Sequence, residues 1–153
     1  MKKRVIYFLL GTFIVVAAII LIGLYLLMRT NVTESNNYAG VAMTVDDSTL
    51  SNTGISVVVK NETEKELTFG EEYTLEKKIL GQWYQVMYKP KMIFKPVAWE
   101  AIGYPIAPNS ERIFEINWEW LYGNLSKGTY RIVKGYIVNY PETYNLEAEF
   151  IIR

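Results

Sequence analysis

Hydrophobic and polar residues alternate with a period of two over most of the chain from Gly40 onward. This period is typical of β-strands that bury one face and leave the other in water, because successive side chains point to opposite faces. Turn-forming segments rich in Gly, Pro, Asn, Asp and Ser separate the alternating runs. The runs predict about seven strands, at residues 41–45, 55–60, 71–79, 82–88, 114–120, 128–138 and 144–153. Such short strands without helical periodicity predict an antiparallel β-sandwich.

The clearest alternation lies between Asn109 and Tyr136, where two strands flank an aromatic connection. In the first of these strands, Phe114, Ile116, Trp118 and Trp120 fall on one face. One buried and one solvated face are expected from such a pattern, so these four side chains are predicted to lie in the core. In the second strand the alternation slips around residues 134–135, which predicts a β-bulge or an edge kink there.

A β-hairpin is predicted around Leu80-Gly81, since two alternating runs flank this short turn. Trp83 and Tyr84 are expected to anchor the base of the hairpin in the core. The first strand of the hairpin predicts one buried face, with Tyr73, Leu75 and Ile79, and one solvated face, with Glu72, Thr74, Glu76 and Lys78.

An uncharged run of 24 residues, from Val5 to Met28, precedes the alternating region. As a helix it would be about 36 Å long, against about 30 Å for the hydrocarbon core of a bilayer, so a transmembrane signal anchor is predicted. A cleaved signal peptide is the alternative, but its apolar region would span only ~7–15 residues and end at a small-residue cleavage site. Three basic residues precede the run and one follows it, which predicts a cytoplasmic N-terminus and an extracytoplasmic C-terminal domain.

The apolar run and the alternating region divide the chain into parts. The segment between them is polar and lacks periodicity, so it is predicted to be a juxtamembrane linker. The predicted organisation is a basic cytoplasmic tail at 1–4, a transmembrane helix at 5–28, a linker at 29–39 and a β-sandwich domain at 40–153.

Cys and His are both absent from the sequence. Without Cys there are no disulfides or thiolate metal sites, and without both there are no common zinc sites or nucleophiles activated by a His base. Four of the 16 basic residues flank the apolar run, which leaves 12 basic against 16 acidic residues, a net charge of −4, from Thr30 onward. The domain is therefore mildly acidic, and no nucleic acid is expected among its partners.

The segment from Lys89 to Pro108 holds four of the five prolines and shows no clear alternation. Because proline cannot donate to a strand ladder, this segment is predicted to be a long excursion with a short strand or helical turn near 97–102. Loops on a rigid scaffold often carry function, so a binding surface is expected here. Its candidate residues are Phe94, Trp99 and Tyr104, which could form one exposed aromatic patch, and the basic Lys89, Lys91 and Lys95.

Acidic residues suggest two further kinds of site. Asp46-Asp47 and Glu71-Glu72 could hold Ca²⁺, and Glu100, Glu115 and Glu119 could pair as the carboxylates of a glycoside hydrolase. No EF-hand or nonapeptide calcium pattern is present, and solvated carboxylates that discourage edge pairing are the simpler interpretation. A small sandwich has little room for a catalytic cleft. No metal and no cofactor are therefore predicted, and the protein is expected not to be an enzyme.

The segment from Leu125 to Tyr130 resembles the tyrosine corner of Ig-like domains, in which a Tyr hydroxyl bonds to the backbone a few residues upstream. Leu125, Gly128 and Tyr130 would be its structural residues. With this corner, the chain is similar to the bacterial Ig-like domain family found in exported proteins of Gram-positive Firmicutes. The likeness rests on ISVVVKN at 55–61, FGEEYTLEK at 69–77, GQWY at 81–84, WEWLYG at 118–123 and GTYRIVK at 128–134. It implies one Ig-like domain in an extracytoplasmic setting and carries over no catalytic residue or common ligand.

The predicted function is a membrane-anchored, non-catalytic interaction module that contacts a protein or a cell-wall polymer at the cell surface. The main alternative is an accessory or sensory subunit that pairs with another membrane protein through its helix. A small surface hydrolase is a third possibility, and it would need one of the glutamates for activity.

Overall fold

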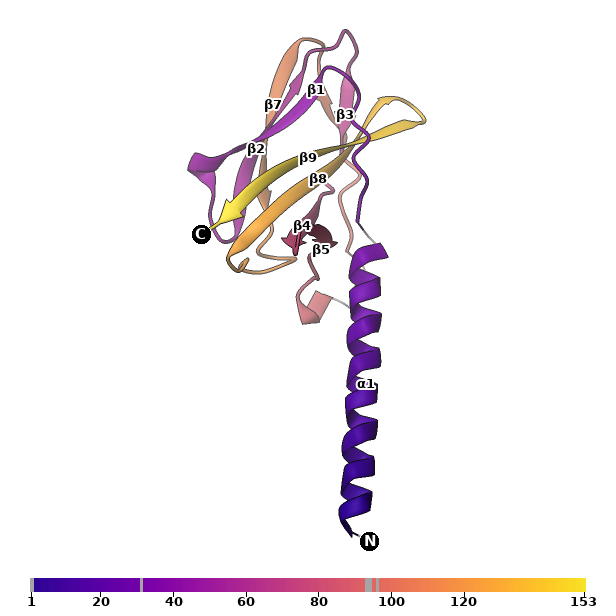
Figure 1. Cartoon of the computed structure of the whole chain (residues 1–153). Helices are drawn as coiled ribbons and strands as arrows, with labels where there is room; N and C mark the ends of the chain where they lie inside the picture. Colours follow the sequence, from indigo (N-terminus) through magenta and orange to yellow (C-terminus); the bar gives the residue numbers. More distant parts are fainter. Residues whose placement is uncertain (1, 31, 93–94, 96) are drawn as a thin grey trace.

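The computed structural model describes residues 2–30, 32–92, 95 and 97–153. A long helix, α1 (Lys2–Thr30), projects from a β-sandwich that contains most of the remaining described residues (Figure 1). The helix is uninterrupted because no proline lies within it. Over the part of α1 whose side chains are described, residues 6, 7 and 9–24, no span is long and apolar enough to cross a membrane.

In the described residues, nine strands form two antiparallel sheets, which confirms the predicted sandwich architecture. The smaller sheet has the order β1-β2-β7, with strands Val41–Asp46, Gly54–Asn61 and Ser110–Asn117. The larger sheet has the order β5-β4-β8-β3-β6, and β9 also pairs with β8. Its strands are β3 (Leu67–Phe69), β4 (Thr74–Ile79), β5 (Gln82–Gln85), β6 (Tyr104–Ile106), β8 (Gly128–Asn139) and β9 (Glu142–Ile152). Two short 3-10 helices, η1 (Asp47–Thr49) and η2 (Pro90–Met92), lie in the connections.

The hydrophobic core fills the space between the two sheets. The indole ring of Trp118 is fully buried and stacks on Phe150 of β9, with ring centroids 5.3 Å apart. Phe150 also stacks on Tyr130 of β8 at 5.6 Å. The smaller sheet contributes the predicted inward residues, among them Ile55, Val57, Val59 and Ile116, all of which are buried.

The connection from β7 to β8 passes from the smaller to the larger sheet. At its end the Tyr130 hydroxyl donates to the carbonyl of Ser126 at 2.7 Å, the hydrogen bond that the resemblance to a tyrosine corner implies. Leu125 is buried beside it. Gly128 has φ 153°, and a Cβ atom at this position would lie 2.7 Å from Cε of Lys77, so a larger residue would displace that side chain.

Trp120 is not a core residue, contrary to the sequence prediction. β7 ends at Asn117, and the backbone then turns helically, with the N–H of Tyr122 donating to the carbonyl of Trp118 at 2.8 Å. The alternation of side chains therefore stops at Trp118. Trp120 points outward and is 42% exposed.

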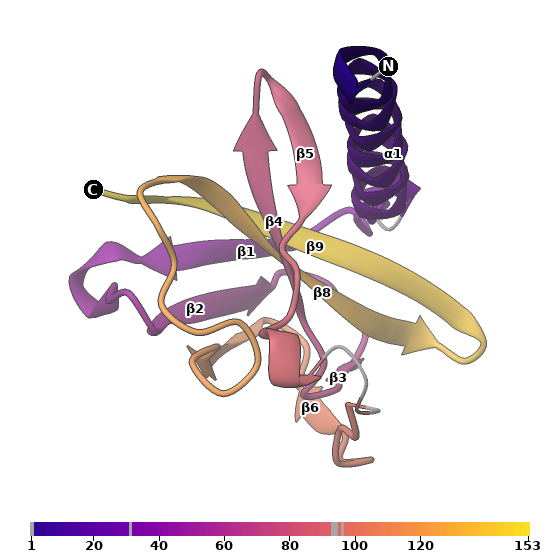
Figure 2. The ribbon, with the colours of Figure 1, turned by 90° about the horizontal axis from the view of Figure 1, so that it is seen from below.

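The predicted hairpin is formed by β4 and β5, and its turn has positive φ at both Leu80 (49°) and Gly81 (81°), as a type I′ turn requires. Figure 2 shows this hairpin projecting from the sandwich on the side where α1 lies. Ile79 is therefore exposed rather than buried, because the smaller sheet does not cover the tip. Tyr84 is buried as predicted, but Trp83 lies on the other face of the hairpin, where Arg131 stacks on it.

The other strand boundaries also differ from the predictions. The strand predicted at 71–79 is shorter in the structure, where β4 begins only at Thr74, and the separate strand β3 precedes it. β3 and β4 pair with successive parts of one edge of β8. No regular element occupies the described residues between 97 and 102, and the excursion instead forms η2 and β6. β6 contains Pro105 and is the outermost strand of its sheet, where a missing N–H is tolerated. The irregularity in β8 lies between Ile137 and Asn139 rather than at 134–135.

The segment 32–38, predicted to be part of a linker, is hydrogen-bonded to residues of β4, β8 and β9. The backbone N–H of Asn145 donates to Oδ1 of Asn36 at 2.8 Å, and the N–H of Tyr38 donates to the Tyr136 hydroxyl at 2.9 Å. Tyr38 also packs edge-on against Tyr144, with ring centroids 5.2 Å apart. The segment is therefore a docked part of the domain.

Beneath this segment lies a buried ion pair. Nη2 of Arg131 lies 2.6 Å from Oε2 of Glu76, and the Glu76 side chain is fully buried. Arg131 also contacts Glu147 through Nη1, and Glu76 accepts a hydrogen bond from the backbone N–H of Thr33 at 2.8 Å. Glu76 was predicted to be solvated, but Arg131, Trp83 and the docked segment cover this face of the sheet.

Candidate binding site

A hollow of about 520 Å³ opens on the surface beside β7, and we call it the aromatic hollow. Three segments that are distant in sequence form its walls: the residues between β3 and β4, the excursion, and β7 with the turn that follows. Its lining residues are Glu71, Tyr73, Trp99, Tyr104, Arg112, Ile113, Phe114, Glu115, Ile116, Asn117, Trp120 and Lys134.

Aromatic rings dominate the hollow and contact one another edge to face. Trp99 contacts Trp120 with ring centroids 5.4 Å apart and Tyr73 with centroids 5.3 Å apart. Tyr104 meets Phe114 at 5.9 Å with an interplanar angle of 87°. These are the favoured geometries for aromatic pairs. The rings therefore support one another and present a preformed apolar surface.

Polar groups at the rim of the hollow are oriented by specific contacts. The hydroxyl of Tyr104 donates to Oε1 of Glu71 at 2.8 Å, and this hydrogen bond raises the pKa of Tyr104. The guanidinium carbon of Arg112 lies 4.9 Å from the centroid of the Tyr104 ring, within cation–π range. The rim thus offers one oriented cation and one carboxylate beside the aromatic surface.

Lys134 of β8 forms part of the floor. Its side chain is buried, and its ammonium donates to the carbonyls of Gly70, Glu71 and Glu72 at 3.0, 3.3 and 3.0 Å. Burial lowers the pKa of Lys134 to about 8, so the amine is protonated at neutral pH. The three carbonyls belong to the break between β3 and β4, so Lys134 fixes this break and the position of the Glu71 side chain.

The structure brings two of the predicted aromatic residues together but changes their role. Trp99 and Tyr104 both line the aromatic hollow, whereas Phe94 lies outside the described residues. Trp99 is half-buried against the core rather than fully exposed. Sequence reasoning missed Trp120 because the alternating pattern of β7 continues in the sequence as far as this residue, which placed it on the buried face. It also missed Tyr73, because the sequence identifies this residue only as one position of a predicted strand and gives no indication of a binding site there.

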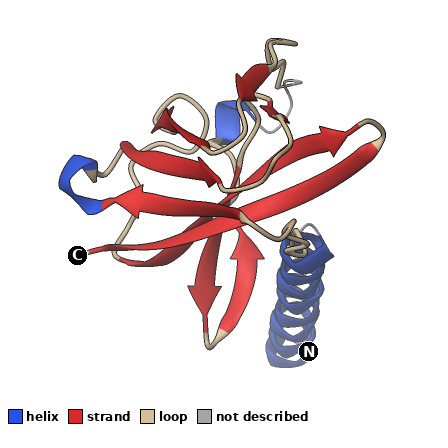
Figure 3. Cartoon of the chain, turned by 90° about the horizontal axis from the view of Figure 1, so that it is seen from above, coloured by secondary structure: helices blue, strands red, loops and turns tan. Residues whose placement is uncertain are grey.

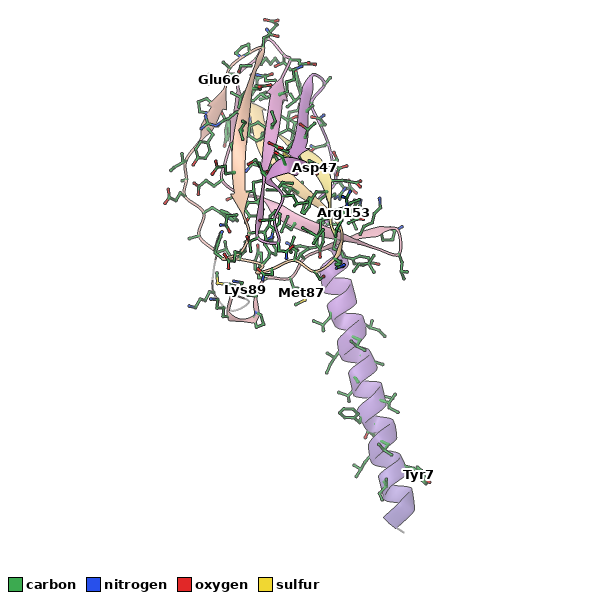
Figure 4. The ribbon with its side chains drawn as sticks, turned by 90° about the vertical axis from the view of Figure 1, so that its left-hand side faces the viewer. Tyr7, Asp47, Glu66, Met87, Lys89 and Arg153 are labelled. Carbon is green, nitrogen blue, oxygen red and sulfur yellow. The ribbon has the colours of Figure 1, made fainter. Side chains whose placement is uncertain are left out.

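The predicted basic residues do not line the aromatic hollow. Lys91 and Lys95 are exposed, and Lys89 is half-buried, with its backbone N–H donating to the carbonyl of Leu121 at 2.9 Å. Figure 4 places Lys89 and Met87 at the end of the domain from which α1 extends, and Glu66 at the opposite end. The basic and aromatic candidates are therefore two separate features.

The acidic candidates form no metal-binding cluster in the part of the chain that the structure describes. No three carboxylates there are grouped as a cation site. Asp46 instead caps η1, because its Oδ1 accepts a hydrogen bond from the Ser48 N–H at 3.0 Å. Glu115 lines the aromatic hollow, whereas Glu100 lines a neighbouring hollow of about 400 Å³.

The two sheets, the crossing connection and the tyrosine corner together define an Ig-like β-sandwich. The chain belongs to the bacterial Ig-like domain family, whose sequence model matches residues 37–151. A search of curated proteins found no match. Membership of this family supports a non-catalytic interaction module. The match begins at residue 37, which lies inside the docked segment.

Proposed function

We propose that this protein is a membrane-anchored, extracytoplasmic Ig-like module that binds a partner at the cell surface through the aromatic hollow. The observation that carries the proposal is the convergence of Tyr73, Trp99 and Trp120 from three separate segments around one hollow. Concave sites lined by aromatic rings with a few oriented polar groups are typical binding sites. The partner would be a protein or a cell-wall polymer.

The surface of α1 supports the anchoring part of the proposal. Its described apolar side chains are exposed around the helix, for example Phe13 (72%), Ile14 (65%) and Leu21 (65%). A helix that is apolar on all sides requires a protein core or a membrane around it. Figure 1 shows that α1 projects away from the sheets, and Figure 3 shows it beside them, so the sandwich does not supply that cover. Lys89 and Lys91 at the adjacent end of the domain suit contact with anionic headgroups.

The predicted topology can be tested with single cysteines, since the chain contains none. In intact cells, Leu80→Cys at the exposed hairpin tip is expected to react with a membrane-impermeant maleimide. Lys3→Cys, on the other side of the apolar run, is expected to react only after the cells are lysed. Equal labelling of both positions in intact cells would contradict an extracytoplasmic domain on a single-pass anchor.

The binding role of the aromatic hollow can be tested with Trp120→Ala. A photo-crosslinking residue placed at position 113, whose Ile is 61% exposed at the rim, should capture the partner in cells. Trp120→Ala is expected to lower the yield of this crosslink at least tenfold, because exposed aromatic anchors dominate binding energy. The free energy of unfolding should change by no more than about 1 kcal/mol, since the side chain is 42% exposed and lies outside the core.

Two matched controls accompany this experiment. Tyr140→Ala removes an 88% exposed aromatic ring at the β8–β9 turn and should leave the crosslink unchanged. The same photo-crosslinking residue at position 80, remote from the hollow, should capture little of the partner. Equal crosslinking by wild type and Trp120→Ala would exclude the aromatic hollow as the binding site.

A further inference from the structure

We infer that the aromatic hollow is a strand-receiving groove, in which an extended peptide of the partner pairs with the free edge of β7 and places alternate apolar side chains against the aromatic rings. This inference rests on the proposed function, since it names the kind of partner that the same site would bind. β7 is the outermost strand of the smaller sheet, and β2 is its only partner among the described strands.

The backbone of β7 directs hydrogen-bonding groups into the hollow. The N–H of Trp118 donates to the carbonyl of Thr53 at 2.8 Å, and this pair continues the register between β2 and β7. In an antiparallel ladder, residues that bond to the neighbouring strand alternate with residues that do not. Even-numbered residues of β7 therefore bond to β2. Ile113 and Glu115 direct their N–H and C=O groups to the free side.

Tyr73 provides independent support for this assignment. Its hydroxyl, inside the hollow, donates to the carbonyl of Asn117 at 3.0 Å, so an odd-numbered carbonyl of β7 does face the hollow. The hollow also runs along six consecutive residues, Arg112–Asn117. A groove beside a strand edge touches consecutive residues, whereas a groove on one face of a strand would touch every second residue. The hollow therefore follows the edge of β7.

The two outermost strands near the hollow differ in how their edges are protected. β6 has only three residues and contains Pro105, which removes a donor from the edge. β7 has eight residues, contains neither Pro nor Gly, and keeps a continuous register with β2. A long, regular edge is a template for strand addition. The peptide would therefore pair with β7 rather than β6.

The side chains beside the edge define the chemistry of the peptide. On the outer face, Ile113 is 61% exposed, and Glu115 lies opposite Ser56 with no ion pair in the described residues. On the inner face, Phe114 contacts Tyr104 edge to face, and both line the hollow. An added strand would place apolar side chains toward the rings and a basic side chain opposite Glu115. The occupant is therefore an extended peptide that alternates apolar and basic residues.

The test uses the full-length chain in detergent and three labelled octapeptides that alternate lysine and valine. One peptide is unmodified, one is N-methylated at its lysines and one is N-methylated at its valines. In antiparallel pairing, directly opposed residues share a face, and every second opposed pair exchanges hydrogen bonds. Since Ile113 and Glu115 direct their N–H and C=O groups to the free side, the lysines opposite them would be the residues that bond to β7. N-methylation at lysine is expected to weaken binding at least tenfold, and N-methylation at valine less than threefold. A glutamate–valine octapeptide should also bind at least tenfold more weakly than the unmodified peptide.

Amide hydrogen exchange gives a second readout on the same complex. Saturating unmodified peptide is expected to slow exchange at the amides of Ile113 and Glu115 at least tenfold. The amides of Phe114 and Ile116 already bond to β2 and should change little, so they serve as internal controls.

Equal affinity of the three lysine–valine peptides, or unchanged exchange at Ile113 and Glu115, would overturn strand addition. So would failure of every peptide to bind. In each of these cases the proposed function stands as long as Trp120→Ala still lowers the yield of the crosslink in cells at least tenfold. If Trp120→Ala also leaves that crosslink unchanged, the proposed function falls together with the inference.

Discussion

Replacing Arg131 with Met is expected to destabilise the domain by about 3–5 kcal/mol, because it leaves the buried carboxylate of Glu76 without its cation. The Glu76 side chain is fully buried, and its Oε2 lies 2.6 Å from Nη2 of Arg131. Met preserves much of the volume that packs on Trp83, so the loss reflects charge rather than a cavity. The measurement is chemical unfolding of the full chain in detergent, followed by tryptophan fluorescence.

A surface ion pair on the same sheet provides the matched control. Lys78 and Glu149 lie 3.9 Å apart, and their side chains are 39% and 53% exposed. Lys78→Met should therefore cost less than about 1 kcal/mol. The double variant Glu76→Gln with Arg131→Met should recover part of the lost stability, since neither charge of the pair then remains. If Arg131→Met costs no more than Lys78→Met, water reaches Glu76 and the buried pair does not hold this face together.

Trp118→Ala is expected to cost about 3–5 kcal/mol, the range for removing a large aromatic side chain from a packed core. Trp118 is fully buried, stacks on Phe150 at 5.3 Å, and donates from Nε1 to the carbonyl of Asn52 at 2.9 Å. Its loss would remove contacts with both sheets and leave that carbonyl without its donor. Thermal unfolding monitored by far-UV circular dichroism would measure the effect.

Trp120→Ala is the natural comparison for Trp118→Ala, since it removes the same side chain two positions along the chain. Because Trp120 is 42% exposed, its removal should cost about 1 kcal/mol or less. The expected pattern is a stable protein with weakened binding for Trp120→Ala and a destabilised protein for Trp118→Ala. Similar losses of stability in both variants would show that Trp120 is a core residue after all.

The strands of the sandwich were predictable because burial on one face leaves a period of two in the sequence. The pattern at Ile55, Val57 and Val59 is of this kind, and all three are buried. The same rule misplaced Trp120, because a helical turn after Asn117 has no separate signature in an alternating sequence. Alternation reports local geometry and contains no information about where a strand ends in a tight turn.

The burial of Glu76 could not be predicted from its neighbours in sequence. Its cover comes from Arg131, 55 residues away, and from Thr33, 43 residues away. The aromatic hollow could not be predicted from the sequence for the same reason. Trp99 was selected as a loop residue, but only the folded chain brings it beside Trp120 and Tyr73. Sites formed by segments that are distant in sequence depend on long-range packing, and the periodicity of residues along the chain does not report that packing.

The docked segment 32–38 has a mechanical consequence. A domain on a loose tether tumbles independently of its anchor, and its binding face points in all directions. Here backbone hydrogen bonds tie the chain to the sandwich from Thr33, three residues after α1 ends at Thr30. Since three residues of fully extended chain span at most about 11 Å, the domain stays within that distance of the end of α1, and its binding face can reach only a partner that lies near that end of the helix.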